Sequence, residues 1–179
     1  MSKSVRSVII LLFIAGAVAF YLGYRRNSKS GVEIGEDAPD FTLPGLTQSS
    51  LALANYKQKV VVVNFWATWC PPCVEETPSL EKFAAKVQPM GVSVIGVSVD
   101  QDRAALEKFV SDYHMSYPIG LDPDRTLAAR YGTFQFPETY IIDRNGRVAE
   151  KIIGAIDWQD PRILSFVETL APESAKRAE

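Results

Sequence analysis

The segment 59–66, KVVVVNFW, is the feature that most limits what this chain can fold into. A run of this length that is apolar except for Lys59 and Asn64 is typical of a strand that is buried on both faces of a sheet. A second run of the same kind, GVSVIGVSVD, follows at residues 91–100. Each run precedes a segment whose apolar residues recur at helical spacing. Strands that alternate with helices predict an α/β fold.

The remainder of the chain from about Ala38 extends this pattern. Helices are expected at residues 73–87, where Pro78 should cause a kink, and at residues 102–113, 123–132 and 160–170. Residues 138–154 read as two antiparallel strands joined at RNG, which is a hairpin signal. The predicted architecture is therefore a mixed sheet flanked by helices.

Composition excludes several classes of protein. The 179 residues are 47% hydrophobic and 22% charged, which predicts one compact domain with extensions. A net charge of -2, without a long basic run beyond the N-terminus, argues against a nucleic-acid partner. Two cysteines are too few for a disulfide-stapled scaffold.

The N-terminus differs from everything that follows. No charged residue lies between Arg6 and Arg25, and that stretch is almost entirely apolar or small. Residues 1–26 are interpreted as a signal anchor with a single membrane segment at about 7–24, because a span needs about 17–25 apolar residues. In the alternative reading, the AVA sequence at 17–19 is a signal-peptidase site. Charge does not decide the orientation, since both flanks are basic.

The other predicted divisions follow from composition. The polar, glycine-containing segment 27–36 is expected to be a tether. Residues 37–170 are expected to form the domain, and residues 171–179 a flexible tail. An exported domain is the reading that these features favour.

Both cysteines lie in WCPPC, between the first buried strand and the helix after it. A sulfur at that junction lies beside the unpaired N–H groups and the positive dipole end of the helix, which favour a thiolate. Cys70 is therefore the predicted nucleophile, and Cys73, one turn further on, resolves the mixed disulfide. The two prolines between them place the helix start at about Pro72 and offer no N–H groups. Cys73 and Val74 remain as donors to the sulfur, so we expect a modestly lowered Cys70 pKa.

Several motifs resemble the thioredoxin-like family, in particular its membrane-anchored extracytoplasmic branch, the TlpA, ResA and CcmG (DsbE) group. This resemblance implies a domain on the extracytoplasmic (periplasmic) side of a bacterial cell membrane. NFWATWCPPC resembles the strand-turn-helix signature, with Pro78 at the position of the proline that kinks the helix. FPETYIID resembles the second signature and GEDAPDFTLPGL a segment shared with peroxiredoxins. Residues 91–124 resemble a strand-helix insertion of this branch. The resemblance covers about residues 35–170 and implies a thioredoxin-like fold.

The resemblance also implies roles for individual residues. Pro137 matches the proline that is cis and packs against the dithiol, which would expose the backbone of Phe136 to an extended substrate. The alternative is a proline that merely opens the following strand. With Trp69, an apolar platform beside the dithiol, these two residues form the expected substrate-binding surface. Phe136 is bulky for its position, so partner choice is not carried over.

Two polar positions receive interpretations of their own. Asn64 occupies the place of a buried aspartate in thioredoxins and cannot relay a proton. Glu76 matches a glutamate near the dithiol in the TlpA-like branch, and it is expected to influence deprotonation of Cys73. Its alternative reading is an exposed acid in the first helical turns. Glu75 is expected to be solvated. His114, the only histidine, lies at a predicted helix end and is expected to be a surface or capping residue.

The leading functional hypothesis is a membrane-tethered enzyme that exchanges thiols and disulfides through its Cys-Pro-Pro-Cys dithiol. It would reduce disulfides in exported proteins, with apocytochrome c the sharpest candidate, and a membrane thiol-reductant donor would re-reduce it. A peroxiredoxin-like thiol peroxidase is a second hypothesis, although Thr68 lacks the accompanying proline. A non-enzymatic metal-binding module is the third, although four zinc ligands are not available. No cofactor and no resident metal are expected.

Overall fold

The computed structural model describes residues 10–21 and 31–171. Residues 10–21 are helical and belong to a unit separate from the rest of the chain. Within the described residues, no helix combines the length and the apolar character that crossing a bilayer requires. The predicted membrane segment extends past this helix on both sides, beyond the described residues. The predicted tail lies outside them from residue 172 onward.

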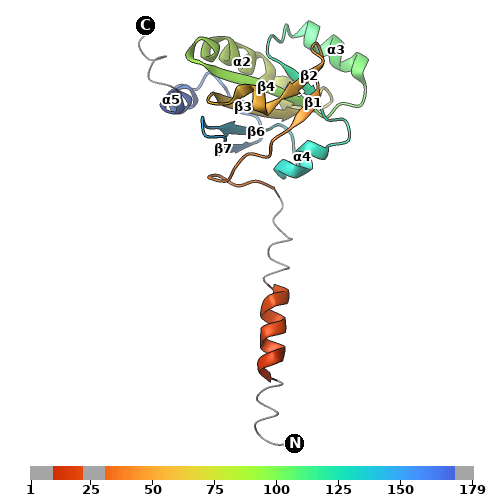
Figure 1. The fold of residues 1–179 in the computed structure, drawn as a ribbon. Coiled ribbons are helices and arrows are strands. Elements are labelled where there is room, and N and C mark those ends of the chain that lie inside the picture. Colours follow the sequence, from red (N-terminus) through yellow and green to blue (C-terminus); the bar gives the residue numbers. More distant parts are fainter. Residues whose placement is uncertain (1–9, 22–30, 172–179) are drawn as a thin grey trace, which may run out of the picture. The chain divides into compact units, whose positions relative to one another are not determined.

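The domain is built on a five-stranded sheet in the order β5-β4-β3-β6-β7 (Figure 1). Its strands are β3 (Val60–Trp66), β4 (Val92–Ser98), β5 (Ile119–Leu121), β6 (Glu138–Ile142) and β7 (Val148–Ile153). β3, β4 and β5 pair in parallel, whereas β6 is antiparallel to β3 and β7 is antiparallel to β6. The predicted mixed sheet is confirmed. Its central strand β3 is buried at every residue, as its predominantly apolar sequence indicates.

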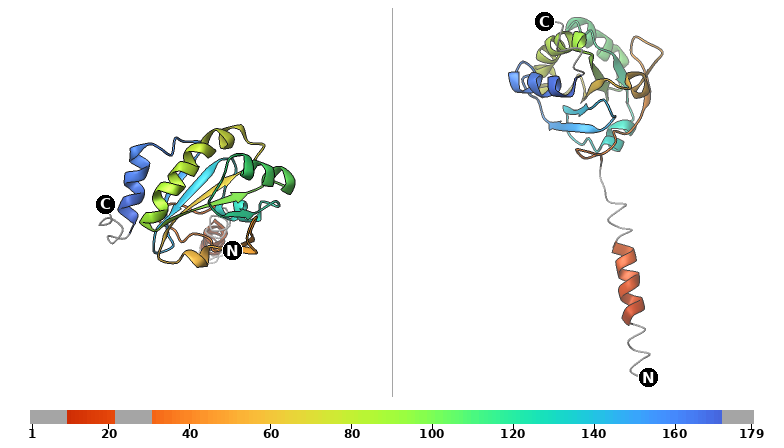
Figure 2. Two further views of the ribbon diagram at one scale, coloured as in Figure 1. Left: turned by 90° about the horizontal axis from the view of Figure 1, so that it is seen from above. Right: turned by 60° about the vertical axis from the view of Figure 1, so that its left-hand side comes forward.

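Helices cover both faces of the sheet. They are α2 (Pro71–Val87), α3 (Arg103–Asp112), α4 (Thr126–Tyr131) and α5 (Pro161–Leu170), with 3-10 turns at Leu53–Tyr56 and Gln88–Met90. In the two views from the side and from above, α2, α3 and α5 lie over one face, and α4 lies beneath the other (Figures 1 and 2).

Neighbouring residues of β3 explain this arrangement. Side chains alternate between the faces of a strand. Trp66 accordingly contacts Phe109 of α3, with ring centroids 5.2 Å apart. Phe65 points the other way and contacts Tyr131 of α4 at 5.2 Å. The core thus forms two layers, one on each side of the sheet.

A two-stranded antiparallel sheet of β1 (Thr42–Pro44) and β2 (Ser50–Ala52) was not predicted. Three-residue strands are too short for an alternation signal. The hairpin packs on the sheet edge at Gly120 of β5, where an added Cβ would lie 2.9 Å from Leu43. A glycine at this position lets the hairpin approach closely.

Residues 31–36, part of the predicted tether, are described. Val32 is buried, its N–H donates to the carbonyl of Tyr131, and Gly35 donates to Val148. This segment therefore contacts the domain from Val32 onward.

Candidate active site

The two cysteines lie at the junction between β3 and α2, at the carboxyl edge of the sheet. Cys70 is the N-cap of α2, with an extended backbone at φ -97° and ψ 105°. It forms a disulfide with Cys73, and the two Cα atoms are 5.3 Å apart. The expected pairing of the two sulfurs is present.

The hydrogen bonds at the start of α2 partly match the expectation. The helix begins at Pro71, one residue earlier than expected, since both prolines are tolerated in its first turn. The N–H of Cys73 donates to Sγ of Cys70 at 3.3 Å, as predicted. Val74 was wrongly expected to be a donor to the sulfur. Its N–H donates to the carbonyl of Cys70 at 3.1 Å, because this is the first bond of the helix.

Both sulfur-bearing residues are largely covered in the disulfide state. Cys70 is 5% exposed and Cys73 is 1% exposed. Both residues are therefore buried in this state, Cys73 slightly more than Cys70.

A buried carboxylate holds the loop that carries Cys70. Asp100, just past the end of β4, accepts hydrogen bonds from the N–H of Thr68 with both oxygens, at 3.2 and 3.1 Å. The Thr68 hydroxyl also donates to it at 2.6 Å, and the Ser98 hydroxyl at 2.8 Å. This contact was missed from sequence, although acids at the ends of neighbouring parallel strands meet at one sheet edge.

The loop before β6 meets the cysteine loop. The Phe136–Pro137 peptide bond is cis, as the resemblance implied. Phe65 of β3 pairs with Glu138 of β6, so the proline lies beside the end of β3. The rings of Trp69 and Phe136 form an edge contact at 6.1 Å. Trp69 is 56% exposed, which leaves much of its ring facing solvent.

Glu76 belongs to the dithiol helix α2 and is buried, with only 3% of the residue exposed, so the exposed reading is wrong. Its carboxylate accepts hydrogen bonds from Asn64 Nδ2 at 2.8 Å, from Trp158 Nε1 at 3.3 Å and from the N–H of Ile156 at 3.3 Å. Burial raises the pKa of Glu76, and these three donors partly oppose the rise. Its neighbour Glu75 is exposed, as expected.

Glu76 lies three residues after Cys73, on the same side of α2. Its hydrogen bonds in the described part of the chain go to nitrogen donors rather than to either sulfur. An influence on Cys73 would therefore act across space or through solvent.

A second buried glutamate, Glu138, lies on the opposite face of the sheet and was not predicted. It is fully buried, and the ammonium of Lys151 lies 3.1 Å from Oε1. The hydroxyl of Tyr140 donates to the same oxygen, and burial raises the pKa of Tyr140 above its usual value. An ion pair with low exposure on both partners holds this carboxylate in place.

Other candidate features lie away from the dithiol. His114 is exposed, with a positive φ of 52°, just after α3. Among residues 10–21 and 31–171, no cluster of three or more His, Cys, Asp or Glu side chains is arranged to hold a metal ion.

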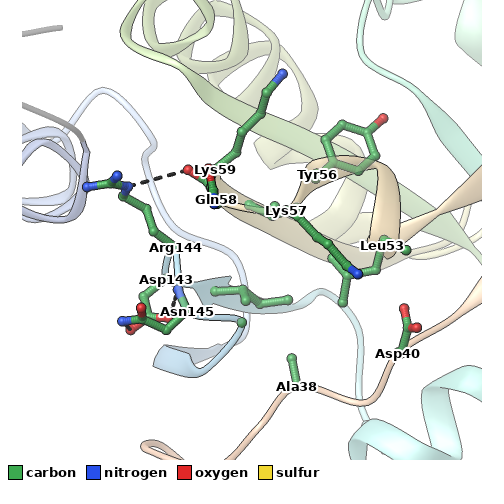
Figure 3. A pocket seen from close by; sticks show the side chains of 14 residues that line it. Ala38, Asp40, Leu53, Tyr56, Lys57, Gln58, Lys59, Asp143, Arg144 and Asn145 are labelled. Atoms are coloured by element: carbon green, nitrogen blue, oxygen red, sulfur yellow. Dashed lines mark hydrogen bonds between the residues drawn. The ribbon is translucent and has the colours of Figure 1, made fainter. Parts of the chain in front are cut away.

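A hollow of about 380 Å³ lies at the opposite end of β3, about 20 Å of strand from the cysteine loop (Figure 3). Its rim carries Lys57, Lys59 and Arg144, and Arg144 donates to the carbonyl of Gln58 at 3.4 Å. No group with thiol or disulfide chemistry lines it.

Comparison with known proteins agrees with this geometry. The sequence matches the AhpC/TSA family over residues 34–151. The chain belongs to this family. The thiol-disulfide oxidoreductase ResA of Bacillus thuringiensis (strain Al Hakam) is 36% identical over 149 residues, which cover 82% of this chain and 86% of that protein. ResA of Geobacillus thermodenitrificans is 33% identical over 167 residues, which cover 93% of this chain and 95% of that protein.

A solved structure has the same fold. A Chlorobium tepidum protein assigned as the thiol:disulfide interchange protein DsbE superimposes with a TM-score of 0.72 and 28% identity. The match covers 77% of this chain and 99% of that one. This family member is thus a thiol-disulfide oxidoreductase of the ResA/DsbE type with a thioredoxin-like fold. Its substrates are disulfide-containing proteins.

Proposed function

We propose that this chain is a membrane-tethered reductant of disulfides in exported proteins, and that Cys70 and Cys73 carry the reaction. One observation supports this above all others: Cys70 caps α2 and forms a disulfide with Cys73. The two sulfurs are therefore close enough to form the disulfide that the reaction requires.

The reaction begins with the reduced pair. The Cys70 thiolate attacks one sulfur of a substrate disulfide, a Cys70–substrate bond forms, and the other substrate sulfur leaves as a thiolate that takes up a proton. Cys73 loses its proton and attacks the Cys70 sulfur, which releases the second substrate thiol. Two electrons pass from protein to substrate. A membrane dithiol donor restores the reduced pair by the same chemistry.

Glu76 is the proposed positioning residue for the second step. It is buried one helical turn beyond Cys73, and its raised pKa keeps it able to exchange a proton at a higher pH than an ordinary carboxyl. Asn64 and Trp158 fix the orientation of its carboxylate.

The proposed substrate surface is formed by Trp69, Phe136 and Pro137. The described hydrogen bonds leave the backbone of Phe136 unused, which suits pairing with an extended substrate segment. Phe134, in the same loop, is 75% exposed and enlarges the apolar surface.

The proposed location is the extracytoplasmic side of a bacterial membrane, with a single N-terminal segment of about residues 7–24 as the anchor. The helix at 10–21 supports this, because its apolar side chains are exposed, Leu11 at 65% and Phe13 at 77%. The proposed domain and tail follow the predicted boundaries, except that the domain begins at about Val32, because Val32 and Gly35 are bonded to it and leave a shorter tether. Apocytochrome c is the proposed principal substrate, because haem attachment needs reduced cysteines.

The two alternatives receive less support. Thr68, the residue that a peroxidase would need beside its cysteine, donates its hydroxyl to Asp100 instead. A metal-binding module would need ligands that the described residues do not gather.

Trapping tests the proposal. Replacement of Cys73 by Ala should let Cys70 hold its substrates as mixed disulfides, which reducing agent then releases for identification by mass spectrometry. The double variant Cys70→Ser, Cys73→Ala is the matched control and should capture nothing. Capture that includes apocytochrome c supports the named substrate. Equal recovery from both variants would overturn the role of Cys70.

A further inference from the structure

Arg125 occupies an unusual place beside the proposed substrate surface. Its guanidinium carbon lies 5.6 Å from the ring centre of Trp69 and 5.7 Å from that of Phe136. These two rings contact each other, and they belong to the residues next to Cys70 and Pro137 in the chain. A cation is thus held against two aromatic rings whose residues adjoin Cys70 and Pro137 in the chain.

The backbone directs Arg125 to this place. Its φ is 55° and its ψ is 26°, in the left-handed region that residues other than glycine seldom adopt. Buried Asp122 maintains this conformation: its carbonyl accepts from the N–H of Arg125 at 2.9 Å, and its carboxylate accepts from Leu127 and Ala128. Asp122 is joined to β4 in turn, because its N–H donates to the carbonyl of Ser98.

The charge of Arg125 is available to a ligand. The residue is exposed, and within residues 10–21 and 31–171 its guanidinium forms no ion pair. The buried carboxylates on the same sheet edge are occupied, Asp100 by Thr68 and Ser98, and Asp122 by α4. Arg presents a planar fork of donors that matches a carboxylate.

We propose that Arg125 is a specificity-determining residue that selects substrate disulfides flanked by Asp or Glu. This inference rests on the proposed function, because it assumes that Cys70 attacks the substrate. The substrate cysteine bonds to Cys70, the chain beside it lies over Trp69 and Phe136, and a flanking carboxylate reaches the guanidinium that these rings hold. Selection then depends on charge as well as on the apolar surface.

Single-turnover kinetics test the inference. The full chain carrying Cys73→Ala is mixed, in a non-ionic detergent, with peptides whose single cysteine is joined to pyridine-2-thiol and flanked on both sides by Glu, Gln or Lys. The Cys70 thiolate attacks the peptide sulfur, the peptide–pyridyl bond breaks, and 2-thiopyridone leaves after taking up a proton. Its absorbance gives the second-order rate constant for each peptide.

The expected order of rate constants is Glu above Gln above Lys. Arg125→Gln should lower the Glu-to-Lys ratio about five- to tenfold, and about 0.5 M salt should shrink the parent's ratio by screening the charges. Arg125→Glu should invert the order. Each ratio compares two peptides on the same protein. A change in the reactivity of Cys70, or a loss of active protein, affects both rate constants equally and therefore cancels from the ratio.

Lys86→Gln is the matched control. It removes the same charge from the far end of α2, about 24 Å of helix from Cys70, and should keep the parent's ratio. The role of Arg125 would be overturned if the Cys73→Ala chain reacted equally fast with the three peptides, or if neither Arg125 variant changed the Glu-to-Lys ratio of rate constants. Either result would leave the proposed function intact. If 2-thiopyridone were released no faster than with the double variant Cys70→Ser, Cys73→Ala, the proposed function itself would be overturned.

Discussion

Asn64 on β3 and Glu76 on α2 are joined by a hydrogen bond of 2.8 Å from Nδ2 to Oε1, and both side chains are buried. The second N–H of the same amide donates to the hydroxyl of Thr139 on β6, at 2.9 Å. The amide therefore links the helix that carries Cys73 to two strands of the sheet. An aspartate at this position would offer no such donor when ionised.

Replacement of Glu76 by Gln should change how stability depends on pH. Below the ordinary pKa of 4.5, Glu76 is protonated in both the folded and the unfolded chain. Above it, the unfolded chain loses the proton first, so the buried group lowers stability as pH rises, until the raised folded pKa is passed. Each tenfold difference in proton affinity is worth about 1.4 kcal/mol. As the pH rises from 4 to 7, the free energy of unfolding of the variant should therefore increase relative to that of the parent, as measured by urea unfolding.

Glu75→Gln, on the exposed side of the same helical turn, controls for the loss of one carboxyl. If the difference in the free energy of unfolding between Glu76→Gln and the parent stays constant across the pH range, the raised pKa of Glu76 is contradicted.

Trp158→Phe should raise the pKa of Glu76 further. The indole N–H is one of the three donors that lower this pKa, and Phe keeps an aromatic ring against Phe83, whose ring centre lies 5.0 Å from that of Trp158. The carboxyl signal of Glu76, followed by NMR across a pH titration, should move to a higher midpoint. A midpoint equal to or below the parent's would show that the indole does not stabilise the carboxylate.

Asp100→Asn should loosen the cysteine loop. The change replaces a charged acceptor of four hydrogen bonds from Thr68 and Ser98 by an amide with one acceptor oxygen. We expect a loss of about 1–3 kcal/mol in the free energy of unfolding. Faster amide exchange at Thr68 and slower insulin-disulfide reduction should accompany it. Asp112→Asn, at an exposed site on α3, is the comparison variant, and equal losses in the two proteins would argue against a role for the buried acid.

The two cysteines should fail in different ways. Cys70→Ser should abolish both turnover and the formation of mixed disulfides, because the attacking sulfur is gone. Cys73→Ser should abolish turnover yet still form a mixed disulfide, since Cys70 remains beside the Cys73 backbone N–H. Gel-shift analysis after reaction with an oxidised peptide distinguishes them. Mixed disulfides of similar yield from both variants would mean that the two sulfurs are interchangeable as nucleophiles.

The parts of the fold that follow from local chemistry were predictable. The predominantly apolar run at 59–66 indicates a strand that is buried on both faces, and the structure places β3 at Val60–Trp66. Gly132 closes α4 with a φ of 78°, a conformation that costs glycine little. Pro71 and Pro72 determine the position of Cys70 just outside the helix, because a proline is accepted in the first turn and disfavours a helical residue before it.

Contacts between distant segments were decided by the tertiary structure alone. Glu76 and Trp158 are 82 residues apart, and only the packing of α2 against the segment before α5 brings the indole to the carboxylate. Arg125 reaches Trp69 and Phe136 because a left-handed backbone turns it toward them. The sequence by itself determined the longer helices and strands and the dithiol, since these depend on neighbours along the chain, whereas it did not reveal the short β1–β2 hairpin. Which charges and donors surround the dithiol depended on how loops from three strand ends meet, and no local pattern encodes that meeting.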